Sequence, residues 1–289
     1  MTAVRVELPL AAERGRNRSL IIGASVLAFE PANVVDAARR IVGMGYKRIE
    51  LCCSTPGFDY RTVTEDTVGR LRALASEHDL KYTLHPHVVN TADTRETEGR
   101  EVLAHYVGAA RLAGRVGAER IVVHGGNRHH PSVERARAME RSLEVIAKVG
   151  EIAAAEGVGL MLENTDWGDT RIMDTPVDLL AMRTQCPEGT KLLLDTGHSV
   201  LQGFDPAECA RLWMPHLAES HAHDNRGLDD EHLAVGDGAI DWDALIAELV
   251  KGNWLGVLMI EIIPEAGGAA GIKRSHERIK SALARSTKP

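Results

Sequence analysis

The chain has 289 residues, of which 44% are hydrophobic and 26% are charged, and its formal net charge is −7. This composition is typical of a folded globular protein and excludes a disordered chain, while the negative charge argues against a surface that holds many phosphates of a nucleic acid. No apolar run reaches the roughly 18 residues of a membrane span, and residues 1–18 lack the apolar core of a signal peptide. We therefore expect a cytoplasmic protein without a membrane partner.

The cysteines do not form a recognisable framework. They lack the spacing of metal ligands, and two of them are adjacent, which argues against a set of disulfides. We expect buried thiols in the core at Cys52, Cys53, Cys186 and Cys209.

Short apolar runs alternate along the chain with segments whose apolar residues recur at helical spacing. A short continuous apolar run bounded by turn residues is typical of a parallel strand that is buried on both faces. The runs predict strands over residues 19–27, 48–52, 81–85, 119–124, 158–163, 191–195, 217–221 and 255–261. The helical patterns lie between and after them, over residues 32–44, 62–78, 95–116, 131–156, 176–185, 205–213, 242–250 and 272–283.

Eight strand-helix units of about 30 residues each, with no break in composition, favour a closed parallel barrel over an open sheet. No G-x-G-x-x-G sequence follows the first strand, so nothing supports a dinucleotide-binding sheet. We predict one α/β domain, a (β/α)8 TIM barrel, over residues 19–285, with an N-terminal extension at 1–18 and a tail at 286–289.

Six consecutive predicted strands end in a histidine or an acid. A single such acid is often only the cap of the next helix, and a single histidine is often a structural core residue. In a barrel, however, the carboxyl ends of all strands meet at one mouth, so the recurrence predicts a metal site there. Imidazole and carboxylate ligands without thiolate suit Zn²⁺, Mn²⁺, Fe²⁺ or Co²⁺. The six residues are His85, His124, Glu163, Asp195, His221 and Glu261.

Three further residues extend this set. His198 follows Asp195 across a Thr-Gly turn, close enough to share a metal or a substrate with it. Asp230 and His232 lie in the acidic loop after the seventh strand. Such a loop is usually only solvated, but the histidine in its middle favours a functional role.

These motifs together resemble the xylose-isomerase-like barrel superfamily, which holds sugar isomerases and epimerases as well as apurinic-site nucleases of the endonuclease IV type. The resemblance covers residues 19–284. It rests on TLHPH (83–87), VVHGG (122–126), MLENT (161–165), LLLDTGH (192–198), SHAHDN (220–225), DEHLAVGDGAIDW (230–242) and MIEII (259–263).

The two branches of the superfamily imply different metal contents. In the epimerase branch, one divalent ion would be held by Glu163, Asp195, His221 and Glu261. In the nuclease branch, these four are joined in a three-metal cluster by His85, His124, His198, Asp230 and His232. All nine positions are filled here, which allows more than one ion per chain.

Other features distinguish the branches. The nuclease pattern places wedge residues for DNA after the third strand, where this chain has Val88 and Val89. The arginines that could reach a DNA backbone, Arg95, Arg100 and Arg128, are interspersed with acidic residues. Both observations argue against a nucleic-acid partner.

The resemblance also suggests substrate contacts. The acid near the end of the second strand resembles the sugar-enzyme branch, and the arginine of DNRG resembles a substrate-binding arginine, although a plain surface arginine is an equal alternative. The substrate-binding residues expected on this basis are Glu50, His87, His198 and Arg226.

The resemblance therefore implies a divalent-metal-dependent isomerase or epimerase of carbohydrate metabolism, acting on a sugar, a sugar phosphate or a related ketone. Glu163 and Glu261 would be the catalytic pair, one removing a proton beside the carbonyl and the other returning it, while the metal stabilises the enediolate. The alternative is a multinuclear phosphoesterase of the endonuclease IV type, and a purely structural metal barrel is disfavoured by the number of ligands. The sequence allows a homo-oligomer and leaves the substrate and the native metal open.

Overall fold

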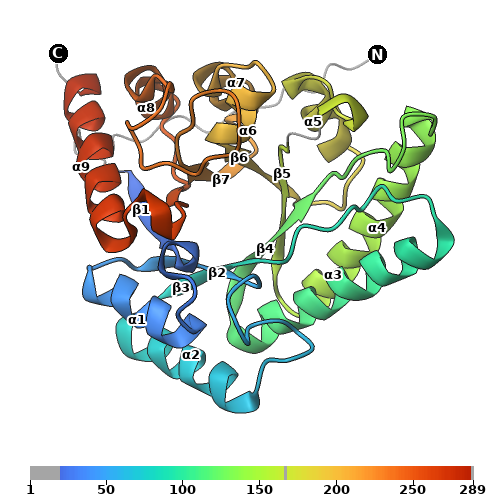
Figure 1. The fold of residues 1–289 in the computed structure, drawn as a ribbon, viewed down its shortest axis with the longest axis horizontal. Helices are drawn as coiled ribbons and strands as arrows, with labels where there is room; N and C mark the ends of the chain where they lie inside the picture. Colours follow the sequence, from blue (N-terminus) through green and yellow to red (C-terminus); the bar gives the residue numbers. More distant parts are fainter. Residues whose placement is uncertain (1–19, 166–167, 288–289) are drawn as a thin grey trace, which may run out of the picture.

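The computed structural model describes residues 20–165 and 168–287. Within these residues, eight parallel strands pair in chain order and close into a barrel, with the last strand bonded to the first. The helices surround the barrel (Figure 1). This confirms the predicted (β/α)8 fold and its single domain. The extension predicted at residues 1–18 lies outside the described residues, and the domain boundaries at 18 and 285 stay predictions.

The eight strands are short and regular. They are β1 (Ile21–Ser25), β2 (Arg48–Cys52), β3 (Lys81–His85), β4 (Ala118–His124), β5 (Gly159–Glu163), β6 (Lys191–Asp195), β7 (Leu217–Ala222) and β8 (Val257–Ile260). The α-helices are α1 (Val34–Gly43), α2 (Glu65–His78), α3 (Glu96–Val116), α4 (Arg135–Ala155), α5 (Pro176–Arg183), α6 (Thr196–Leu201), α7 (Pro206–Trp213), α8 (Trp242–Lys251) and α9 (Gly268–Ser286). Three short 3-10 turns complete the described elements, namely η1 (Val26–Phe29), η2 (Gly168–Thr170) and η3 (Pro264–Ala266).

Several predicted boundaries differ from the structure by a few residues, and two of them were wrong for local reasons that the structure shows. The first strand stops at Ser25 because the hydroxyl of this residue accepts a hydrogen bond from the backbone N–H of Leu27 at 3.2 Å and caps η1. The Thr-Gly turn predicted after β6 is instead the first turn of α6, capped by Asp195. Capping side chains of this kind end one element and start the next within two residues.

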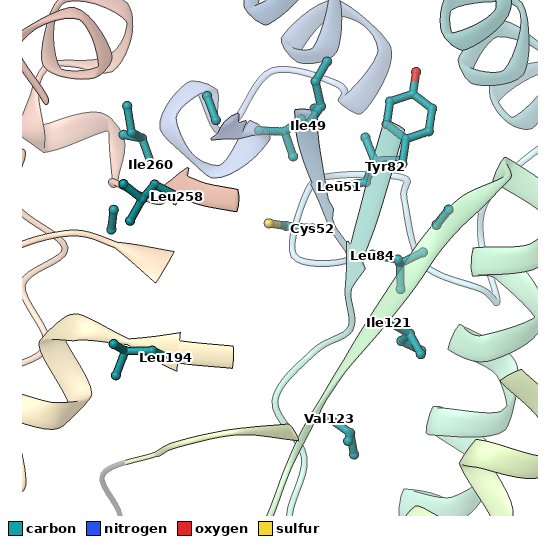
Figure 2. Close-up of a cluster of buried hydrophobic side chains, with 14 of the residues drawn as sticks. Ile49, Leu51, Cys52, Tyr82, Leu84, Ile121, Val123, Leu194, Leu258 and Ile260 are labelled. Carbon is teal, nitrogen blue, oxygen red and sulfur yellow. The ribbon is translucent and has the colours of Figure 1, made fainter. Parts of the chain in front are cut away.

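Side chains alternate between the two surfaces of the barrel wall. Those on the outer surface, such as Ile49 and Leu51 of β2 and Leu84 of β3, fill the space between the strands and the helices (Figure 2). On the inner surface, Val122, Met161 and Leu193 belong to a separate small apolar cluster. The alternation has a period of two, so the residue two positions later on each strand shares the same surface.

This period explains where the polar side chains gather. His124, Glu163 and Asp195 each lie two residues beyond a member of the inner apolar cluster. They therefore form the next layer toward the carboxyl ends of the strands. On β4, β5 and β6 the sequence changes from apolar to ionisable at this layer, which makes the mouth of the barrel polar.

The cysteines match the expectation in most respects. Cys52, Cys53 and Cys209 are buried free thiols, whereas Cys186 is only half-buried. Across the described residues, no helix is both long enough and apolar enough to pass through a membrane.

Candidate metal centre

All nine predicted ligands meet at the mouth of the barrel. Seven of them line a cavity of about 320 Å³, namely His85, His124, Glu163, His198, Asp230, His232 and Glu261. Asp195 and His221 lie beneath them and are fully buried. Side chains that are distant in the sequence thus meet because parallel strands of a barrel all end on one side.

Glu163 lies at the centre of the inner part of the site and contacts four histidines. Its Oε2 atom lies 2.8 Å from Nε2 of His124 and 3.5 Å from Nε2 of His85. Its Oε1 atom lies 3.3 Å from Nδ1 of His221 and 3.6 Å from Nδ1 of His198. One buried carboxylate therefore contacts ligands from β3, β4, β7 and α6.

His221 shows most clearly what the inner part can hold. Its Nε2 atom is hydrogen-bonded to Oε2 of Glu50 at 2.8 Å, which leaves Nδ1 directed into the site. Nδ1 lies 3.3 Å from Glu163, 3.6 Å from Asp195 and 3.2 Å from Glu261, yet it is buried without a hydrogen bond.

Nδ1 of His221 thus lies close to three carboxylates but has hydrogen-bond geometry with none of them. Side chains that share one cation are arranged in this way. A metal-bound histidine commonly donates the N–H of its other ring nitrogen to a carboxylate, as His221 can to Glu50. Buried polar atoms are normally paired, and Oε2 of Glu163 is a second buried atom without a hydrogen bond in this site. The residues present therefore fit a divalent ion.

An outer group adjoins the inner one. Oδ2 of Asp230 lies 3.3 Å from Nε2 of His198 and 3.1 Å from Nε2 of His232. Nδ1 of His232 in turn lies 3.7 Å from Oε2 of Glu261, which joins the outer group to the inner one. The donor set of this outer group is again imidazole and carboxylate.

Asp195 caps a helix and also approaches the inner part of the site. Its Oδ1 accepts a hydrogen bond from the backbone N–H of His198 at 2.7 Å and so caps α6. Its Oδ2 also lies 3.6 Å from Nδ1 of His221. The cap fixes the start of α6 and thereby the position of the His198 ring at the edge of the cavity.

Sequence reasoning missed His223. This fully buried residue is hydrogen-bonded through Nε2 to both carboxylate oxygens of Asp195, at 2.9 and 3.0 Å, and its ring stacks on His232 at a centroid distance of 4.0 Å. His223 therefore supports Asp195 and the ring of His232, and one of its nitrogens also lies within 4.8 Å of ligand atoms of His232 and Glu261. The period of two from His221 was the signal that could have revealed it.

The four expected substrate contacts occupy different environments. His87 and His198 line the cavity. Glu50 is fully buried behind His221 and does not line the cavity, because Cys52 takes the mouth position of β2. Arg226 is largely exposed, is ion-paired with Glu231 and does not line the cavity. The contacts of all four with substrate stay predictions.

Electrostatics divide the site into negative and positive groups. Burial favours the neutral form of Glu163, but the charges of His124 and His221 hold its pKa well below the usual range. Burial likewise opposes charge on the histidines, yet Glu163 raises the pKa of His85 to about 9 and Asp230 raises the pKa of His232 to about 9. In the metal-free protein, the positive charges of these protonated rings balance the negative charges of the carboxylates.

The layer beneath the mouth contains two more acids. Burial works against ionisation of Glu50, but His221 lowers its pKa to about 2, so it remains a carboxylate. Burial and the nearby charge of Glu50 raise the pKa of Glu219 to about 7, and Glu219 accepts a hydrogen bond from Thr83 at 3.0 Å.

The amino-acid sequence is similar to those of known proteins. A family model described as xylose isomerase-like TIM barrel matches residues 38–282. An uncharacterized protein of Methanocaldococcus jannaschii is 25% identical over 248 residues, which cover 83% of this chain and 82% of that protein.

Two solved structures share the fold. A D-tagatose 3-epimerase-like protein superimposes with a TM-score of 0.80 at 22% identity, over 92% of this chain and 98% of that one. The IolI protein, solved with a bound zinc atom, has a TM-score of 0.75 at 17% identity, over 92% of this chain and 99% of that one. At these identities the likeness establishes the architecture alone.

Metal affinity should rise with pH. A divalent ion must displace the protons of His85 and His232, whose pKa values of about 9 mean that both rings are charged at pH 7 in the metal-free protein. Each proton released makes binding about tenfold weaker per unit of pH below the pKa. Competition with a chelator should show Mn²⁺ binding more tightly at pH 9 than at pH 7. Equal affinity at both values would contradict the assignment of these histidines as ligands.

Proposed function

Because this chain belongs to the xylose isomerase-like TIM barrel family, we propose that it is a metal-dependent enzyme that isomerises or epimerises a sugar or a related ketone. The observation that carries the proposal is the His221 ring, held by Glu50 on one side and facing three carboxylates on the other. The fold shared with a D-tagatose 3-epimerase-like protein supports the choice of sugar chemistry.

The ion would be held by four side chains from different strand ends, namely Glu163, Asp195, His221 and Glu261. Imidazole with carboxylates suits Mn²⁺, Zn²⁺, Co²⁺ or Fe²⁺, and the zinc in the IolI structure supports a divalent ion of this type. When bound, such an ion supplies Lewis acidity to a carbonyl and its neighbouring hydroxyl.

The two glutamates are placed to move a proton across a substrate. Glu163 ends β5 and Glu261 follows β8, and each lies within 3.3 Å of the same nitrogen of His221. A low pKa keeps Glu163 ionised, which suits a base that removes the proton beside the carbonyl. Burial and the charge of Glu50 raise the pKa of Glu261, which suits the acid that returns a proton.

The cavity favours an uncharged substrate over a sugar phosphate. Among the described residues, no lysine or arginine lines the cavity, whereas Leu27, Pro86 and Val88 do. A phosphate group is usually recognised by arginine, lysine or a helix N-terminus. A volume of about 320 Å³ lies at the lower end of the range for small-molecule pockets, which suits a monosaccharide.

One observation supports phosphoester hydrolysis as a second candidate function. All nine ligands of the nuclease pattern converge at the mouth, so the site has the residues for more than one ion. The same ligands could then activate a water and hold both oxygens of the scissile bond. The cavity without cationic residues makes this candidate the weaker of the two.

Replacing either glutamate by glutamine should stop proton transfer. We expect Glu163→Gln and Glu261→Gln to lower kcat by roughly 100-fold or more, because a general acid or base contributes about that much. Glu208→Gln on the outside of α7 is the control and should behave as wild type. The measurement is turnover of a panel of ketoses with Mn²⁺, in ²H₂O, where isotope incorporated at carbon reports proton abstraction.

Circular dichroism should be unchanged in all three variants, because glutamine keeps the size of glutamate and these side chains lie outside the apolar core of the barrel. If Glu163→Gln still incorporates deuterium at the wild-type rate, Glu163 is not the base.

The chain should not cut DNA at abasic sites. Incision requires cations that hold the flanking phosphates, but Arg95 is paired with Asp93 and Glu98, and Arg100 with Glu96. We expect no cleavage of a duplex with one abasic site at physiological salt, and only weak, salt-sensitive binding. Efficient incision that is lost in Glu261→Gln would instead establish the hydrolytic candidate.

A further inference from the structure

The connection between β7 and α8 supplies Asp230 and His232, two of the three side chains of the outer group. No regular element is assigned within residues 223–241. His232 moreover has a φ of 44°, in the left-handed region that a residue with a side chain rarely adopts unless its surroundings hold it there. Some feature of the loop must therefore fix its shape.

Asp224 is that feature. Its side chain is fully buried, and its two oxygens accept four hydrogen bonds. Oδ1 accepts from the backbone N–H groups of Asn225 and Ile240, each at 3.1 Å. Oδ2 accepts from the backbone N–H of Gly236 at 3.0 Å and from Nε1 of Trp242 at 2.8 Å. One carboxylate thus ties together the start, the middle and the end of the loop.

The backbone of Asp224 reinforces this arrangement beside a ligand. Its N–H and C=O pair with those of Leu233, the residue after His232, at 2.9 and 2.8 Å. Gly238 packs so closely that a Cβ atom there would lie 2.3 Å from Oδ1 of Asp224. The loop is therefore wound tightly around this one carboxylate.

We propose that Asp224 is a positioning residue that holds the β7–α8 loop so that Asp230 and His232 face the barrel mouth, and that the outer part of the metal centre depends on it. Asp224 does not line the cavity and acts through the loop. The inference rests on the metal-binding part of the proposed function and adds to it the element that assembles the outer group.

Asp224 holds the loop through its negative charge and its capacity to accept hydrogen bonds. The test therefore uses a substitution that changes these two properties and keeps the size of the side chain. In Asp224→Asn, the amide NH₂ group replaces one oxygen and faces two N–H donors that it cannot accept from. Trp242→Phe is a milder variant that removes a single donor and keeps an aromatic ring in the core. Asp241→Asn is the matched control, because Asp241 lies at the exposed end of the same loop and only caps α8.

The test loads each purified protein with Co²⁺ and measures bound equivalents and visible absorption, together with amide hydrogen exchange over residues 223–241. We expect wild type and Asp241→Asn to bind more than one equivalent. Asp224→Asn should keep the inner ion, bind the outer one about 10- to 100-fold more weakly and exchange its loop amides faster than wild type, with the strands unaffected. Trp242→Phe should show a smaller change in the same direction, and it decides the outcome if Asp224→Asn does not fold.

Two results overturn the inference in distinguishable ways. If wild type binds more than one equivalent and both variants retain wild-type cobalt binding, Asp224 does not position the outer group, and the proposed function stands. If wild type itself binds no more than one equivalent, no outer ion exists and the inference fails, while the inner ion of the proposed function is unaffected.

Discussion

The imidazole of His221 is held by Glu50 on one side and approached by Glu163, Asp195 and Glu261 on the other. Several carboxylates buried within a few ångströms of one another repel, and each has lost its hydration, so the arrangement requires compensating positive charge. Protons on the surrounding histidines supply that charge in the metal-free chain, and a divalent ion would supply it in the loaded enzyme. The raised pKa values of His85, His198, His221 and His232 and the fit to a metal thus have one cause.

The barrel can hold these buried charged side chains close together and still keep an apolar core. Below the mouth, Val122, Met161 and Leu193 form a small apolar cluster inside the barrel, and the apolar residues on the outer surface of the strands pack against the helices. The predicted ligands gather toward the carboxyl ends of the strands, above Glu50 and Glu219, so the apolar layer between strands and helices is left intact. The rigid strands place the inner ligands, whereas the outer ligands depend on a loop wound around Asp224.

The sequence predicted the strand order and the six side chains at strand ends because both follow from local patterns: an apolar run, then an ionisable residue. His198, Asp230 and His232 were predicted instead from a turn, an acidic loop and the family resemblance. It did not predict that Asp195 caps a helix and also approaches His221, nor that His223 supports Asp195. These contacts join residues from different elements and depend on the exact depth of each side chain. Glu50 illustrates the limit, since two strand positions separate it, behind His221, from Cys52 in the cavity wall.

The central claim is that Nδ1 of His221 binds a divalent ion while its Nε2 atom stays bonded to Glu50. Anomalous diffraction from crystals soaked in Zn²⁺ tests it most directly. The account predicts a zinc peak about 2.0–2.2 Å from Nδ1 of His221, with oxygens of Glu163, Asp195 and Glu261 completing the coordination. A peak bonded to Nε2 of His221, or no zinc within bonding distance of this ring, would contradict it.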